Sequence, residues 1–509
     1  MSGGWQSLVP TNALVLLALL VGLLNNVLIA ALFGLTRNVD AFFAATMLPN
    51  LFMFLCVDYL GKNFLPVLAL AKLQGEASAS ELVSTLVTVM VAVTVSVGVV
   101  LLALSDALFT LLLPGFDDAD VVLVSRYFWI MAPAMVLMAV NALHEYVCQY
   151  DQRFVQVMAI RAALPSANLA AIVLLGPVVG EYCLPLGYLA GHGVVFVLMA
   201  RQAKYAYRPR IRLRRNLEGK VLRNSAIVMS TGFVARTKSI VVNALASSLG
   251  GGAISSLAFA TKLTEPLERA AFSAVKMFMF SHTARLFADG KGRELGQLYA
   301  VGLRMCFLVL MPLLGWVCVN GDALVEMIFL RGEFTAQMTT LVAAALVALA
   351  PSVLFVGVGQ LLANAFYALG RVKVPALVMP LGMLLFVAAS VPLSRVLGTQ
   401  GIALSTTVAS VIVFGVLLAC LSRAIEELPL GRVSLQLLTY TLLGGGVMGG
   451  ATAVLRELPL TPLAVAAVSL PVGATLYLGA LALARDRTLG TLSSYARQWV
   501  ARDGYHAAP

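Results

Sequence analysis

The stretch that decides the fold is NALVLLALLVGLLNNVLIAALFG at residues 12–34, which carries no charged side chain. A helix of roughly 20 apolar residues crosses the core of a bilayer, so this block is long enough to span it. Similar blocks recur to about residue 484, and 60% of the 509 residues are hydrophobic. A soluble domain could not bury so much apolar surface. The sequence therefore predicts a polytopic membrane protein.

The spans are predicted to be helices, because a membrane barrel would show short segments of alternating polarity instead. Only 12% of the residues are charged, and mean hydropathy is +0.92. A polar side chain inside a span is therefore costly and is a functional candidate. About fourteen spans are expected, near residues 12–34, 41–73, 82–112, 122–149, 155–177, 182–202, 222–248, 253–287, 296–318, 337–369, 373–394, 398–424, 434–455 and 461–484.

The loops between these spans alternate in charge. Acidic residues follow the third, fifth and ninth spans, whereas basic residues fill the loops of the other side. The positive-inside rule makes the basic side cytoplasmic and places both termini there. The net charge of +11 is thus a property of loops, and no stretch resembles a nucleic-acid-binding module. The N-terminus lacks a basic region and a cleavage site, so the first span is expected to be retained.

The chain is predicted to contain two six-helix bundles, at residues 1–202 and 222–424. A basic cytoplasmic linker at 203–221 joins them, two extra helices follow at 425–486, and a tail occupies 487–509. Weak similarity between the halves, at an offset of about 215–218 residues, indicates a parallel repeat. The linker is interpreted as a topology and anionic-lipid signal, with a dedicated partner site as the alternative.

Seven short motifs stand out along the chain. They are Phe33-Gly34, Asp40-Ala41-Phe42-Phe43, Leu48-Pro49-Asn50-Leu51, Phe64-Leu65-Pro66-Val67-Leu68, Pro114-Gly115-Phe116, Arg331-Gly332-Glu333-Phe334-Thr335 and Ala365-Phe366-Tyr367-Ala368-Leu369-Gly370. Together they resemble the MviN/MurJ family, the lipid II flippases of the multidrug/oligosaccharidyl-lipid/polysaccharide exporter superfamily. The resemblance implies two lobes around a central cavity and a groove for a polyprenyl tail in the last two spans. It also implies an undecaprenyl-pyrophosphate-linked saccharide as cargo, moved outward across the bacterial inner membrane.

The sequence departs from the family pattern at three places. Asn25-Asn26 stands where the family usually has an Arg-Asp pair, Phe52-Met53-Phe54 replaces arginines, and Lys262 replaces an arginine in the eighth span. Those arginines are the pyrophosphate ligands that the resemblance implies. An exopolysaccharide or O-antigen repeat unit is therefore an alternative cargo to lipid II. A cation-coupled multidrug exporter is a further alternative, although it would favour acidic and aromatic cavity residues over basic ones.

A pyrophosphate that crosses a low-dielectric cavity needs cations. In the eighth span, Lys262, Glu265 and Arg269 follow helical spacing and fall on one face with Lys276. We interpret this face as a head-group site with a structural charge network as the alternative. Arg236 is a further predicted ligand, since guanidinium grips phosphate bidentately, while Lys238 points the other way.

Other polar residues within the spans are candidates for cargo binding or coupling. Asn25 and Asn26 can bond sugar hydroxyls or another helix. His144 and Glu145 can carry a proton or serve a structural role. The second span holds the possible pair Asp58 and Lys62, the bend-forming Pro49 and, at its outer end, Asp40 as a gate residue or a helix N-terminal acid.

No cofactor or metal is expected, because the histidines and cysteines form no ligand motif. The chain has no HExxH, GxSxG or P-loop motif, so it is predicted not to be an enzyme. Coupling to a monovalent cation or a proton remains open. The expected partners are the lipid-linked saccharide and membrane lipids, with the protein acting as a monomer.

Overall fold

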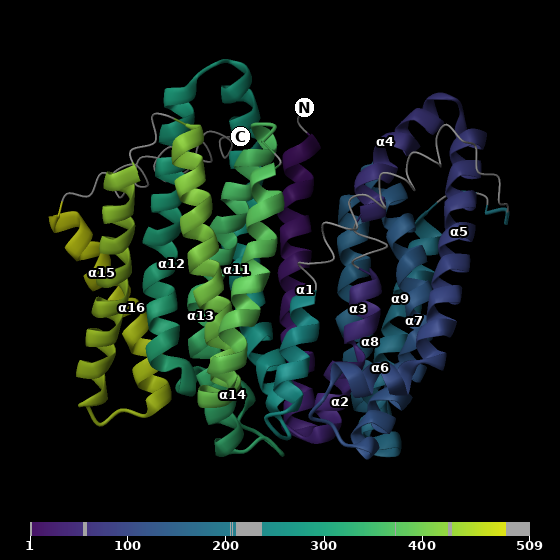
Figure 1. Cartoon of the computed structure of the whole chain (residues 1–509), viewed down its shortest axis with the longest axis horizontal. Coiled ribbons are helices and arrows are strands. Elements are labelled where there is room, and N and C mark those ends of the chain that lie inside the picture. The colour runs from purple at the N-terminus through teal and green to yellow at the C-terminus, as the bar shows by residue number, and fades with distance from the viewer. Residues whose placement is uncertain are drawn as a thin grey trace, which may run out of the picture. The chain divides into compact units, whose positions relative to one another are not determined.

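The computed structural model describes residues 3–53, 59–203, 205, 207–209, 237–371, 373–425 and 430–484. These residues are almost entirely helical and contain no strand (Figure 1). The chain divides into two compact units. Unit 1 comprises Met1–Phe259 with Arg331–Met338, and unit 2 comprises Ala260–Leu330 with Thr339–Pro509.

Unit 1 is organised around α7 (Asp118–Tyr150), a long helix that begins with a capping box at Asp117. Its other described helices are α1 (Gly3–Phe33), α2 (Arg37–Ala45), α3 (Met47–Met53), α4 (Tyr59–Leu73), α5 (Glu76–Ala103), α6 (Ser105–Leu112), α8 (Phe154–Val179), η2 (Gly180–Tyr182), α9 (Cys183–Gln202), residues 237–247 and the start of α11 (Ala253–Ala288). Helix α7 packs against α2 to α6, α8 and α9, and α1 packs against α8.

Unit 2 contains the rest of α11 together with α12 (Gly292–Phe329), α13 (Ala336–Ala368, which enters unit 2 at Thr339), α14 (Lys373–Ala424), α15 (Leu430–Arg456) and α16 (Pro462–Leu483). The last two helices pack on α12. A Cβ added to Gly315 would lie 2.9 Å from the Cα of Gly445, so small residues let α12 and α15 approach closely. Asn320 of α12 donates a 3.2 Å hydrogen bond to the hydroxyl of Thr452 of α15. This buried hydrogen bond stabilises the packing of the two helices.

In the part of the chain that the structure describes, nine helical stretches are long and apolar enough to cross a membrane. Two of them, of 49 and 52 residues, each hold a pair of predicted spans. In each, a glycine with φ of 59° divides the two spans, Gly180 in one and Gly398 in the other. The prediction of an all-α polytopic fold is therefore confirmed.

The predicted second span, 41–73, is not one continuous helix. Helix α2 ends at Ala45 and α3 begins at Met47, with Thr46 between them in a turn. In a continuous helix the ring of Pro49 would clash with the carbonyl of Ala45, four residues earlier, so the break falls where this proline requires it. The predicted third span, 82–112, is likewise divided into α5 and α6 at Leu104.

Unusual backbone positions recur at the offset expected for the repeat. Left-handed φ values occur at Gly34 and Gly252, at Gln152 and Gly370, and at Gly180 and Gly398, each pair 218 positions apart. The same offset relates Pro133 inside α7 to Pro351 inside α13. These positions support the two-copy organisation, which stays a prediction together with the predicted domain boundaries.

Candidate functional site

The basic face predicted in the eighth span lies on α11, within unit 2. The ammonium of Lys262 is 3.2 Å from Oε2 of Glu265, and the guanidinium of Arg269 is 3.8 Å from the same oxygen. Both ion pairs follow the (i, i+3) and (i, i+4) spacing that the sequence indicated. The carboxylate of Glu265 therefore holds two cations on one helix face.

This face carries a surplus of one positive charge and is open to contact. The side chains of Lys262 and Arg269 are 41% and 62% exposed. The guanidinium can bind two phosphate oxygens at once, whereas the ammonium acts as a point charge. Because both cations are already exposed, an anionic group can bind them without a rearrangement of buried side chains. The side chain of Lys276, the fourth member of the predicted stripe, lies outside the described residues.

Helix α11 is held tightly against α13 one turn beyond this face. A Cβ at Gly357 of α13 would overlap the ring of Phe272 of α11. Near the face itself, the amide of Gln360 donates a 3.5 Å hydrogen bond to Glu268. The helix that presents the basic face is thus positioned by a close backbone approach as well as by side-chain contacts.

A second candidate region lies in unit 1, around Asp40. The buried carboxylate of Asp40 accepts hydrogen bonds of 2.7 Å from the backbone N–H groups of Gly252 and Ser255. These groups belong to the first turn of α11, and Gly252 has no side chain with which to cap that helix. Asp40 therefore caps α11 from another helix. The sequence predicted it as a gate residue or as an acid at the N-terminus of its own helix, and the gating role stays a prediction. Burial raises the pKa of Asp40 from 3.8 to about 6.

Arg37 anchors a neighbouring segment, one turn before Asp40. Its Nε is 2.7 Å from Oδ2 of Asp120, its NH2 donates a 3.0 Å hydrogen bond to the carbonyl of Gly115, and its guanidinium lies 4.3 Å from the ring centroid of Phe116. A Cβ at Gly115 would overlap the backbone of Ser247. The Pro114-Gly115-Phe116 motif is thus fixed between α2 and the turn that precedes α11.

The segment Arg331–Met338, which contains the Arg331–Thr335 motif, also packs in unit 1. The backbone N–H of Glu333 donates a 2.8 Å hydrogen bond to the carbonyl of Ala31, at the end of α1. Gly332 has a φ of 61°, and a Cβ there would overlap that same carbonyl. Four of the sequence motifs therefore meet around the ends of α1, α2, α7 and α11.

The sequence analysis did not identify Arg37 as a site residue. Its partners are 78 and 83 positions away along the chain. The only signal available in the sequence was the position of Arg37 between two of the motifs.

The two asparagines of α1 differ in their surroundings. Asn26 is buried and donates a 2.6 Å hydrogen bond to the carbonyl of Gly22 in its own helix. The side-chain oxygen of Asn25 is buried and accepts no hydrogen bond from the described residues. Asn25 is therefore the better candidate of the two for a polar ligand, and a cargo role for either stays a prediction.

His144 and Glu145 of α7 have separate partners. Nε2 of His144 lies 2.8 Å from the hydroxyl of Tyr205, and its Nδ1 is buried without a partner among the described residues. The carboxylate of Glu145 forms an ion pair of 2.6 Å with Arg161 of α8. The two side chains thus serve different contacts, and proton coupling through them stays a prediction.

Three predicted site residues lie outside what the structure describes. These are Arg236, Asp58 and the side chain of Lys62; the roles proposed for them stay predictions. Pro49 is buried in α3, immediately after the break in the second span. Among the described residues, no group of three or more His, Cys, Asp or Glu side chains is placed to hold a metal ion.

The helical stretches of the described residues define a multi-pass membrane protein. The family model described as "Lipid II flippase MurJ" matches residues 29–470, and the chain belongs to that family. The match covers nearly all of the predicted membrane spans, including the motifs that meet in unit 1.

Relatives and solved structures agree with this assignment. The chain is 26% identical over 505 residues to the lipid II flippase MurJ of Burkholderia cenocepacia, which covers 94% of this chain and 96% of that protein. A MurJ structure in an inward closed conformation matches with a TM-score of 0.80 at 16% identity, covering 94% and 99% of the two chains. An inward-facing multidrug transporter of the MATE family matches with a TM-score of 0.67 at 14% identity, covering 81% and 96%. The structural matches establish the shared fold.

Proposed function

We propose that this chain is a flippase that moves lipid II, the lipid-linked peptidoglycan precursor, from the cytoplasmic to the outer leaflet of the inner membrane. It would act as a transporter rather than as an enzyme. The observation that carries the proposal is the match to the lipid II flippase family, which covers almost all of the predicted spans. A match confined to a few helices would support only the fold.

The basic face of α11 supplies a chemical reason for this cargo. A pyrophosphate is costly to bring into a low-dielectric cavity unless cations and hydrogen-bond donors receive it. Lys262 and Arg269 are the proposed ligands, with Glu265 holding both cations in register before the cargo arrives. Preorganisation of this kind lowers the ordering cost of binding.

The Asp40 cap has a proposed role in transport because α11 belongs to both units. The helix begins in unit 1, where Asp40 holds its first turn, and continues in unit 2, where it carries the basic face. Alternating access requires two states with different contacts. Formation and release of this cap would bias the start of the helix that carries the cargo site.

Several parts of the proposal concern the setting of transport. The protein is proposed to act as a monomer, with both termini in the cytoplasm, and to draw on a monovalent cation or a proton. The basic linker and tail support this orientation through the positive-inside rule.

Depletion of the protein in its host tests the cargo. Polyprenyl-linked precursors would be extracted and identified by mass spectrometry, before and after depletion, with re-expression of the intact chain as the control. We expect lipid II to accumulate on depletion and to return to its starting level on re-expression. Accumulation of an exopolysaccharide or O-antigen repeat unit instead would contradict the lipid II proposal and assign the chain to surface polysaccharide export.

A further inference from the structure

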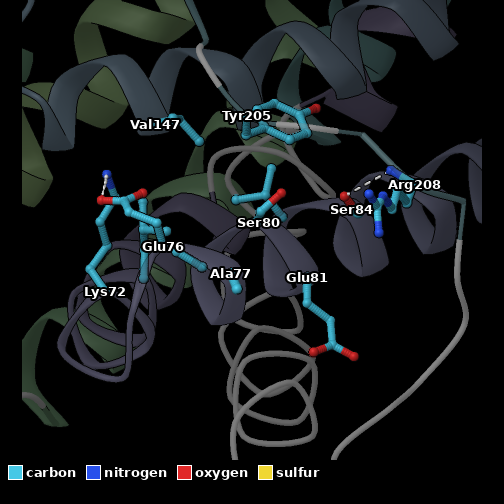
Figure 2. A pocket seen from close by; sticks show the side chains of 12 residues that line it. Lys72, Glu76, Ala77, Ser80, Glu81, Ser84, Val147, Tyr205 and Arg208 are labelled. Carbon is cyan, nitrogen blue, oxygen red and sulfur yellow. Dashed lines mark hydrogen bonds and ion pairs between the residues drawn. The ribbon is translucent and has the colours of Figure 1, made fainter.

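A cavity of about 510 Å³ lies in unit 1 between the end of α4, the start of α5, Tyr205 and Arg208 (Figure 2). This volume falls within the range of small-molecule sites, roughly 300–1,000 Å³. It is distinct from the basic face of α11 and from the Asp40 cap. Its polar lining includes Lys72, Glu76, Ser80, Glu81, Ser84 and Arg208.

The position of α5 places this cavity at the level of lipid head groups. Among the described helices, α5 packs against α4, α6 and α7, and much of its remaining surface is apolar and exposed, as at Val93, Val95, Val99 and Val100. A span of 28 residues with such a surface faces lipid tails. The cavity opens at its first turns, where the helix emerges toward water, so a lipid head group can reach it.

Some charged side chains of the cavity form ion pairs within the described part of the chain, and others do not. The ammonium of Lys72 lies 3.2 Å from Glu76 and 3.3 Å from Asp151, so these three groups satisfy one another. Arg208 and Glu81 take no part in the ion pairs found among the described residues. In Figure 2 the two side chains extend in different directions. One cation and one anion thus remain for a ligand that carries both charges.

The segment that supplies Arg208 is fixed in place before any ligand binds. The hydroxyl of Tyr205 lies 2.8 Å from His144, and that of Tyr207 lies 3.1 Å from Thr88. The backbone N–H of Arg208 donates a 3.2 Å hydrogen bond to the hydroxyl of Ser84. Three hydrogen bonds, at Tyr205, Tyr207 and Arg208, therefore hold this segment against α5 and α7, and Arg208 stays exposed at the cavity.

From this arrangement we infer that the cavity binds the phosphoethanolamine head group of a phospholipid. The phosphate contacts Arg208 and the primary ammonium contacts Glu81, both of which line the cavity. A guanidinium–phosphate contact is a charge-assisted hydrogen bond, as is an ammonium–carboxylate contact. A purely anionic lipid would leave Glu81 facing a negative charge, so the mixed lining favours a zwitterion. The inference does not rest on the proposed cargo.

Native mass spectrometry of the purified full-length protein tests the inference. The protein would be equilibrated with equal amounts of phosphatidylethanolamine, phosphatidylglycerol and phosphatidylcholine, and the retained lipids counted. We expect phosphatidylethanolamine to be retained about tenfold better than phosphatidylcholine, whose trimethylated nitrogen cannot donate a hydrogen bond to Glu81. Phosphatidylglycerol has no ammonium, so we expect it to be retained as poorly as phosphatidylcholine.

Variants separate the two contacts. Glu81→Gln should remove the preference for phosphatidylethanolamine, whereas Glu81→Asp should keep it. Arg208→Gln should lower retention of all three lipids, because each carries a phosphate. Arg395→Gln and Glu457→Gln alter exposed charges away from the cavity and should change nothing. Equal retention of the three lipids, a preference for phosphatidylglycerol, or an unchanged preference in Glu81→Gln would overturn the inference.

Discussion

Oδ1 of Asp40 accepts a hydrogen bond of 2.7 Å from the backbone N–H of Ser255, a residue 215 positions later in the chain. The first turn of a helix leaves backbone N–H groups without partners, and a side chain at the N-cap normally accepts from one of them. Gly252 occupies that place in α11 and offers no side chain. The carboxylate of another helix therefore performs the capping, which joins a short helix near the N-terminus to the helix that carries the basic face.

Replacement of Asp40 by alanine should destabilise unit 1. Asp40→Ala leaves the N–H groups of Gly252 and Ser255 buried without acceptors, and each such group costs about 1–3 kcal/mol. Thermal unfolding of the full chain in detergent would show the loss as a lower midpoint. Asp106→Ala is the matched control, because Asp106 also lies in the first turn of a helix but is exposed. Equal midpoints for the two variants would argue against the capping role.

The stability of the protein should depend on pH through Asp40. Burial raises the pKa of this carboxyl from 3.8 to about 6, so the folded protein holds the proton more tightly than the unfolded chain. The stabilisation is complete below about pH 4 and is lost as the pH rises through about 6. The difference in unfolding midpoint between the native protein and Asp40→Asn, followed from pH 4 to 8, isolates this group. A difference that does not change with pH would contradict the prediction.

The sequence predicted those features that depend on neighbours along the chain. Apolar length gave the spans, and the spacing of Lys262, Glu265 and Arg269 gave the two ion pairs, because both follow from the geometry of a single helix. The position of Pro49 likewise predicted a bend, and the structure places a break in the helix just before it.

Contacts between distant segments could not be predicted in this way. Asp40 reads as an acid in the first turn of α2, and nothing near it in the sequence points to α11. Arg37 reads as a loop cation, although its guanidinium binds Asp120 and Gly115. Such pairs depend on how helices pack in space, which hydrophobic periodicity does not encode. The family motifs marked the residues that meet, without indicating which of them contact one another.

Gly332 should not tolerate a side chain. Its φ of 61° is costly for any residue with a Cβ, and that Cβ would overlap the carbonyl of Ala31. We expect Gly332→Ala to lower the unfolding midpoint by an amount corresponding to about 1–3 kcal/mol. Gly22→Ala is the control, since Gly22 lies inside α1 with no atom within 4 Å of the added Cβ. An undiminished midpoint for Gly332→Ala would show that the Arg331–Met338 segment is not held against α1.

Neutralisation of the basic face should abolish transport without preventing membrane insertion. Lys262→Gln combined with Arg269→Gln removes both cations and leaves Glu265 as an unpaired anion that repels pyrophosphate. Each lost charge-assisted contact is worth about 1.5–3 kcal/mol, so lipid II binding should weaken at least about a hundredfold. The readout is lipid II translocation in vesicles that contain equal amounts of inserted protein. Lys291→Gln is the matched control, because Lys291 forms the same (i, i+3) pair with Glu294 but lies at the start of α12. A double variant that translocates lipid II at the normal rate would exclude the basic face of α11 as the head-group site.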